Sequence, residues 1–270
     1  RYNQFIRQID VFNGLGLANN YWIVSGDSTL PVSSAEHFIL GAAFETSGFL
    51  IDVEVYQKNL YELSTVRFDN STFEVGDSGE REIGGTGKSR GVDVMIQRKS
   101  RRYEGWLSYS YNNTMHTFKE LNDGNPFPAA HENRHQVKWV NSFHAGNWSF
   151  GGTLIFATGS PYTDALGPIR RLNEDGSVEF ILEPAQINGR RLPNYHRLDV
   201  SAVYNFPLGQ NGNGKVGVSL YNVYNRINIR NKRIQLFNQV DGNGNITPLR
   251  IESDILHQPF IPNFFIQASF

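Results

Sequence analysis

The stretch that decides the fold is residues 87–116, GKSRGVDVMIQRKSRRYEGWLSYSYNNTMH. Apolar and polar residues alternate in both of its halves, and alternation at period two predicts a half-buried β-strand. The alternating apolar residues are Val92, Val94, Ile96, Leu107, Tyr109 and Tyr111. Because only residues 99–102 separate the halves, the stretch predicts two antiparallel strands joined by a tight turn.

The same pattern extends in both directions along the chain, and no stretch shows convincing helical spacing. We therefore predict an all-β, antiparallel protein. Its nine expected strands are residues 37–45, 49–61, 87–98, 103–116, 133–144, 147–158, 195–206, 214–226 and 259–270.

The connections between these strands alternate in length. Short turns at 46–48, 99–102, 145–146 and 207–213 alternate with long connections at 62–86, 117–132, 159–194 and 227–258. Bacterial outer-membrane barrels have short periplasmic turns and long external loops. The alternation therefore favours a segment of a transmembrane β-barrel over a soluble β-sandwich, which also gives alternating faces and remains an alternative.

Aromatic residues gather at the short-turn end of the predicted strands, and strand parity puts all of them on the apolar face. They are Phe44, Phe49, Tyr103, Phe143, Trp148, Phe206 and Phe270. Aromatic rings favour the membrane–water interface. We predict that these residues form a belt at the periplasmic interface of an outer membrane.

The number of predicted strands indicates whether residues 1–270 can close a barrel by themselves. With short turns in the periplasm, nine strands place residues 1–36 outside the cell as an extracellular loop and the C-terminus in the periplasm. Bacterial single-chain barrels have an even number of strands and leave no open edge in lipid. We therefore expect residues 1–270 to be the C-terminal part of a larger barrel.

Composition excludes several other classes. The 25 Lys and Arg residues balance 26 Asp and Glu, which gives a net charge of -1 and argues against a nucleic-acid partner. The absence of Cys excludes a disulfide scaffold and thiolate chemistry. A mean hydropathy of -0.41, with no run of 18 apolar residues, excludes a helical membrane protein.

Five stretches resemble the C-terminal half of TonB-dependent outer-membrane receptors of the Bacteroidetes type. They are HFILGAAFETSGFLIDVEVYQKNL from His37, GTGKSRGVDVMIQRK from Gly85, RLPNYHRLDVSAVYNF from Arg191, GKVGVSLYNVYNRIN from Gly214 and the terminal NFFIQASF. The resemblance covers about the whole chain. It implies a roughly 22-stranded barrel around an N-terminal plug, of which the plug and about the first thirteen strands are absent here.

The resemblance also implies a function and partners. Such a receptor binds a scarce nutrient, for example a siderophore, an oligosaccharide or a peptide, and imports it when TonB and its inner-membrane motor proteins move the plug. Other implied partners are outer-membrane lipid, lipopolysaccharide, the rest of the barrel and a surface lipoprotein lid. No enzyme activity, cofactor or metal is expected.

Candidate ligand-binding residues lie in the long connections, because exposed loops carry most recognition. They are Arg67, Phe68, Tyr162, Asp164, Arg170 and Arg171. Solvated surface is the alternative reading for any one of them.

One motif points to an enzyme instead. His131, Glu132 and His135 form the H-E-x-x-H pattern of a zinc metalloprotease, which requires a helix to bring both His onto one face. Pro126 and Pro128 precede the motif and an expected strand follows at once, so we favour a loop leading into a strand.

Overall fold

The structure is a computed structural model of the chain. It describes residues 2–4, 6–12, 19–24, 31–68, 80–172, 176, 178–209, 212–240, 242 and 246–269. Nearly all regular structure in this part is strand, so the all-β prediction is confirmed. Among the described residues, no helix is long and apolar enough to cross a membrane.

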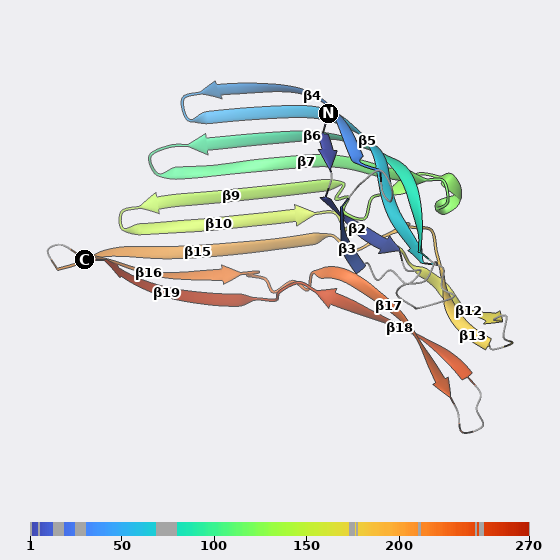
Figure 1. Ribbon diagram of the computed structural model, residues 1–270. Coiled ribbons are helices and arrows are strands. Elements are labelled where there is room, and N and C mark those ends of the chain that lie inside the picture. The colour runs from blue at the N-terminus through green and yellow to red at the C-terminus, as the bar shows by residue number, and fades with distance from the viewer. Residues whose placement is uncertain are drawn as a thin grey trace.

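Nine long strands lie side by side in chain order and form what we call the wall (Figure 1). Every neighbouring pair is antiparallel. The wall strands are β4 (Ser33–Thr46), β5 (Phe49–Phe68), β6 (Glu80–Lys99), β7 (Tyr103–Phe118), β9 (His135–Ala145), β10 (Trp148–Ala157), β15 (Tyr195–Leu208), β16 (Gly212–Tyr221) and β19 (Ile261–Ser269). Each corresponds to one of the nine predicted strands.

The short turns gather at one end of the wall, at the left in Figure 1, and the long connections at the other. Gly48 and Gly146 take positive φ angles of 82° and 61° in two of the tight turns. Glycine adopts this conformation without a steric penalty. The predicted alternation of short and long connections is confirmed.

The register aligns the apolar residues of neighbouring strands, since directly opposed residues share a face of the sheet. Val94 lies opposite Val53 and Tyr109, and Tyr109 lies opposite Val137. This apolar face is open: Leu40 and Ile266 are each 79% exposed. Within the described chain no second sheet covers it, which removes the support for a β-sandwich.

The opposite face of the wall is polar. Asp93 lies opposite Glu54 and Ser110, and Ser110 lies opposite Gln136. Several glycines lie in the half of β6 nearest the long connections. A Cβ at Gly85 would overlap the ring of Phe118, and a Cβ at Gly91 would overlap the ring of Tyr56. The glycine-rich stretch of β6 therefore provides room for aromatic rings.

The long connections contain further short elements. They are η1 (Asn122–Gly124), β8 (Phe127–Pro128), β11 (Pro161–Tyr162), β12 (Ala165–Leu172), β13 (Val178–Pro184), β14 (Arg190–Arg191), β17 (Ile229–Val240) and β18 (Ile246–Leu256). The hairpins β12–β13 and β17–β18 project beyond the wall (Figure 1). They share a small core of Ala165, Leu182 and Ile234.

Residues 1–36, predicted as a loop, contain β1 (Tyr2–Gln4), β2 (Ile6–Phe12), β3 (Asn19–Val24) and the first residues of β4. β2 pairs with β3 and with the outermost part of β5, at Val66 and Arg67. The segment therefore has more regular structure than expected, and β2 lies at the long-connection end of the wall.

Several strand boundaries differ from the prediction. β4 begins at Ser33 rather than 37 and β6 at Glu80 rather than 87, and two further differences have a local cause in the backbone. β16 ends at Tyr221 rather than at 226, because Asn222 turns the chain with a φ of 53°. β5 continues to Phe68 rather than 61, past a bulge between Leu60 and Leu63. Glu62, with a φ of 53°, shifts the alternation there, so the period-two pattern of the sequence breaks before the strand ends.

Candidate functional site

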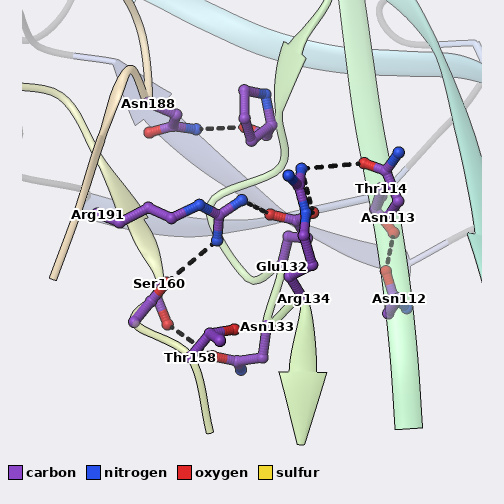
Figure 2. A network of polar contacts seen from close by, with 12 residues as sticks. Asn112, Asn113, Thr114, Glu132, Asn133, Arg134, Thr158, Ser160, Asn188 and Arg191 are labelled. Carbon is purple, nitrogen blue, oxygen red and sulfur yellow. Dashed lines mark hydrogen bonds and ion pairs between the residues drawn. The ribbon is translucent and has the colours of Figure 1, made fainter. Parts of the chain in front are cut away.

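A buried carboxylate joins two of the long connections. Glu132 lies in the turn before β9, and its side chain is 0% exposed. Nε and Nη2 of Arg134 each lie 3.2 Å from Oε1, and Nη2 of Arg191 binds Oε2 (Figure 2). We call these three residues the Glu132 cluster. Both carboxylate oxygens have a cationic partner, which a buried charge requires.

The two arginines extend the cluster into the scaffold. Arg191, on β14, donates from Nη1 to the carbonyl of Gly159 at 3.1 Å. Arg134 donates from Nη2 to Oδ1 of Asn113 on β7 at 3.3 Å. Their side chains remain 31% and 39% exposed. The cluster thus fixes the 158–194 connection to the 119–134 connection and leaves one excess positive charge in contact with solvent.

Uncharged contacts strengthen the same junction. Ser160 donates to Oδ1 of Asn133 at 3.2 Å, and Nδ2 of Asn188 donates to the carbonyl of Pro128 at 2.8 Å (Figure 2). The backbone N–H of Asn188 is bound by Oγ1 of Thr163 at 3.0 Å. The two connections therefore form one fixed layer at the end of the wall.

This geometry does not support the metalloprotease interpretation. Residues 129–134 form turns rather than a helix. His131 is exposed, whereas Nδ1 of His135 lies 2.9 Å from the hydroxyl of Tyr109, on the apolar face of the wall. Glu132 is held by arginines. In the part of the chain that the structure describes, no three acidic or histidine side chains are grouped to hold a metal.

A second charged group lies where the two projecting hairpins meet. We call it the hairpin charge cluster, and it consists of Asp164, Arg190, Lys232, Arg250, Glu252 and Asp254. Nη2 of Arg250 lies 2.9 Å from Asp164 and 2.5 Å from Glu252. Nζ of Lys232 lies 3.6 Å from Glu252 and 3.3 Å from Asp254. The cluster bridges β18 to the segment that precedes β12.

Electrostatics favours the charged form of Lys232 in this cluster. Partial burial alone would lower the pKa of Lys232, but hydrogen bonding to Asp254 and the charges of Asp254 and Glu252 outweigh it and raise that pKa. Arg190 lies 3.9 Å from Asp164 and completes three cations against three carboxylates. The hairpin charge cluster is therefore balanced, in contrast to the Glu132 cluster.

The predicted ligand-binding residues fall into three groups. Tyr162 and Asp164 lie near each other at the hairpin charge cluster, since Tyr162 pairs with Arg190 in the β11–β14 ladder. Arg170 and Arg171 lie on β12, where Arg170 is exposed and Arg171 half-buried. Arg67 and Phe68 end β5, and their side chains lie outside the described structure. Their role in ligand binding stays a prediction.

Six of the seven predicted belt aromatics lie on the apolar face at the short-turn end. Tyr103 lies opposite Phe143, and the Trp148 ring lies 4.9 Å from that of Tyr204. Phe44, Phe49 and Phe206 share this face by strand parity, and Phe270 lies outside the described residues. The guanidinium of Arg98 lies 5.2 Å from the Phe49 ring and 6.0 Å from the Tyr103 ring.

A polar network lies at the long-connection ends of β15 and β16. Arg197 donates to Asp199 at 3.0 Å and to the hydroxyls of Tyr195 at 2.8 Å and Tyr221 at 2.5 Å. Asp199 also accepts the backbone N–H of Asn222 at 2.9 Å. The sequence signal for this network is the pair of opposite charges at Arg197 and Asp199, because strand residues i and i+2 point to the same face.

Known proteins share this architecture. The family model described as TonB dependent receptor-like, beta-barrel, matches residues 6–225. No curated protein sequence matches the chain. The solved structure of the ferric citrate transporter FecA in the unliganded form has a TM-score of 0.51 at 12% identity, over 88% of this chain and 31% of its own.

Two further structures give the same result. The FpvAI–pyocin S2 complex has a TM-score of 0.55, and the ferripyoverdine receptor of Pseudomonas aeruginosa bound to ferripyoverdine has 0.54. Both are 12% identical over 88% of this chain, which spans 28% and 27% of their length. Structural likeness at 12% identity shows the fold alone. The family model matches most of the chain and therefore shows the family. The chain belongs to the family of TonB-dependent receptor-like β-barrels.

Proposed function

We propose that this chain forms the C-terminal part of an outer-membrane transport receptor, which binds a nutrient at its extracellular loops and imports it with TonB-coupled movement of a plug. The observation that carries the proposal is the fixed layer of loops at the long-connection end of a barrel wall, held by the Glu132 cluster. Barrels of this family lie in the outer membrane of Gram-negative bacteria, so the apolar face contacts lipid.

The charges of the loops suggest which nutrient class fits. The Glu132 cluster carries two partly exposed guanidinium groups against one carboxylate, and Arg170 adds an exposed cation on β12. Guanidinium groups bind carboxylates in a bidentate manner. Among a siderophore, an oligosaccharide and a peptide, these loops favour an anionic ligand such as a ferric chelate rich in carboxylates.

The polar face supports the plug as a partner. Wall carboxylates such as Asp93 and Glu54 face the same side as the Arg197 network. We propose that this side contacts the plug, and that lipopolysaccharide and a surface lipoprotein contact the outer rim. Binding and gating account for such a function without any covalent step.

Uptake measurements test the proposal. The full-length receptor is produced in a Gram-negative strain without its own ferric-chelate receptors, with and without TonB, and uptake of iron-labelled chelates is measured. We expect TonB-dependent uptake of at least one anionic chelate, weakened by Arg170→Ala. Lys99→Ala is the matched control, since this exposed residue lies at the short-turn end. Uptake that persists without TonB, or no uptake of any anionic chelate, would contradict the proposal.

A further inference from the structure

Two histidines face each other where the 119–134 connection leaves and rejoins the wall. His116 lies on β7, two residues before the strand ends, and His131 lies in the turn that precedes β9. Their ring centroids are 6.0 Å apart, with an angle of 59° between the ring planes. His116 shares the polar face with Asn112 and Thr114, so the pair lies at the loop end of that face.

His116 has an unsatisfied nitrogen. Its Nε2 is buried and has no hydrogen-bond partner among the described residues. The ring packs edge-on against Phe118, with centroids 6.3 Å apart, and lies over Gly87, where a Cβ would be 3.0 Å from Cδ2. A buried polar atom without a partner is unfavourable, and such atoms in a folded protein generally have a specific reason.

Other histidines of the described chain differ in this respect. A ring nitrogen of His135, of His144 and of His196 lies 2.9 Å from a hydroxyl oxygen in each case. These rings are oriented by Tyr109, Ser149 and Tyr224. His116 instead keeps a buried ring nitrogen without a hydrogen-bond partner, and the exposed imidazole of His131 lies close to its ring. A neutral imidazole nitrogen is a common metal ligand.

The separation suits a shared ion. Imidazole nitrogens bind Zn²⁺ at about 2.0–2.1 Å, which places two rings around one tetrahedral ion at a centroid distance of about 5 Å. His131 is exposed, and a small rotation of its side chain closes the difference. Glu132, the neighbouring acid, cannot join, because both of its oxygens are bound by Arg134 and Arg191.

We propose that His116 and His131 form a two-histidine site for a divalent transition-metal ion, with the remaining coordination positions open to water. The bound ion joins the end of β7 to the turn before β9 and thereby closes the 119–130 loop next to the Glu132 cluster. Affinity follows the order Ni²⁺ < Cu²⁺ > Zn²⁺ that imidazole sites show. The site shares only His131 with the discarded metalloprotease motif, since it uses neither Glu132 nor His135.

The test is calorimetric titration of the metal-free, full-length receptor in detergent with CuCl₂ and with ZnCl₂. We expect a saturable site whose affinity falls at least about tenfold in His116→Ala and in His131→Ala. His144→Ala is the matched control, because that exposed histidine lies at the short-turn end, and it should leave this site unchanged.

Spectroscopy and a second variant keep the result interpretable. The Cu²⁺ spin-resonance spectrum should show two coupled imidazole nitrogens in the wild type and one in each alanine variant. His116→Gln keeps a polar side chain of similar size, so it tests the loss of the ligand apart from folding, which heat-modifiable migration checks. Unchanged affinity in His116→Gln and His131→Ala, or a spectrum without imidazole nitrogen, would overturn the proposal. Neither readout depends on transport.

Discussion

Replacing Glu132 gives the sharpest test of the loop layer. Removal of one partner from a buried ion pair costs about 3–5 kcal/mol, because the remaining charge stays without compensation. Here Arg134 and Arg191 are 39% and 31% exposed, so water can solvate them in part. We therefore expect Glu132→Ala to destabilise the junction by about 2–3 kcal/mol. Local opening should rise by about 30- to 150-fold, at 1.4 kcal/mol for each factor of ten.

Hydrogen exchange measures this opening locally. The relevant amides are those of Leu192, bound to the carbonyl of Ser160 at 3.0 Å, and of Glu132 itself, bound to that of Ala129 at 2.9 Å. Their exchange in the variant should accelerate by the predicted factor, while the amide of Val94 in the wall should not change. Such a difference is expected because parts of a protein open locally with different free energies, and the loop junction can open while the wall stays folded.

The matched control is Glu104→Ala. Glu104 also pairs with a cation, Lys99, but at 3.8 Å and with side chains 51% and 72% exposed. Exposed pairs contribute about 0–1 kcal/mol. Unchanged exchange at Leu192 in the Glu132 variant, or acceleration spread equally over the wall, would refute the role assigned to the Glu132 cluster.

Three further substitutions test the wall and its ends. Gly91→Ala should lower the free energy of unfolding, measured by urea titration in lipid vesicles, by about 1–3 kcal/mol, because the new Cβ overlaps the ring of Tyr56. Gly84→Ala is the control: the new Cβ meets no atom within 4 Å, so the free energy of unfolding should not change. Asn222→Ala should cost about 1–3 kcal/mol in the same titration, because it leaves the N–H and carbonyl of Arg226 without their partner; an unchanged midpoint would contradict this. Val94→Lys should destabilise the folded barrel by about 2–4 kcal/mol if its side chain faces the bilayer midplane, and a neutral result would argue against lipid contact.

Alternation made the wall predictable from sequence. One face of the wall strands carries a run of alternating apolar residues, as at Val92, Val94 and Ile96, so both the existence and the phase of the strands can be read locally. Prediction failed where the backbone left regular geometry. The positive φ angles of Glu62 and Asn222 shift or end the alternation, and residues other than glycine adopt such angles too rarely for the sequence to indicate them.

The loop layer could not be predicted from the sequence, for a different reason. Glu132 binds Arg191, 59 residues further along the chain, and no periodic pattern links positions in two irregular connections. The zinc-protease motif predicts that Glu132 activates a metal-bound water, whereas in the structure Glu132 pairs with arginines. Arg134, two residues after Glu132, was the sequence signal for such an ion pair. The hairpin charge cluster depends likewise on contacts between Asp164 and Arg250 that only the folded chain creates.

Lipid contact of the apolar face is the central claim, and single-cysteine spin labelling measures it directly. Residues 1–270 contain no Cys, and any Cys elsewhere in the receptor is replaced by Ser. Labels are then placed one at a time along residues 92–96 of β6 in the receptor reconstituted into vesicles. We predict a period of two: labels at Val92, Val94 and Ile96 collide mainly with membrane-dissolved oxygen, and labels at Asp93 and Met95 mainly with a water-soluble nickel chelate. Equal accessibility to the nickel chelate at all five positions would contradict the account.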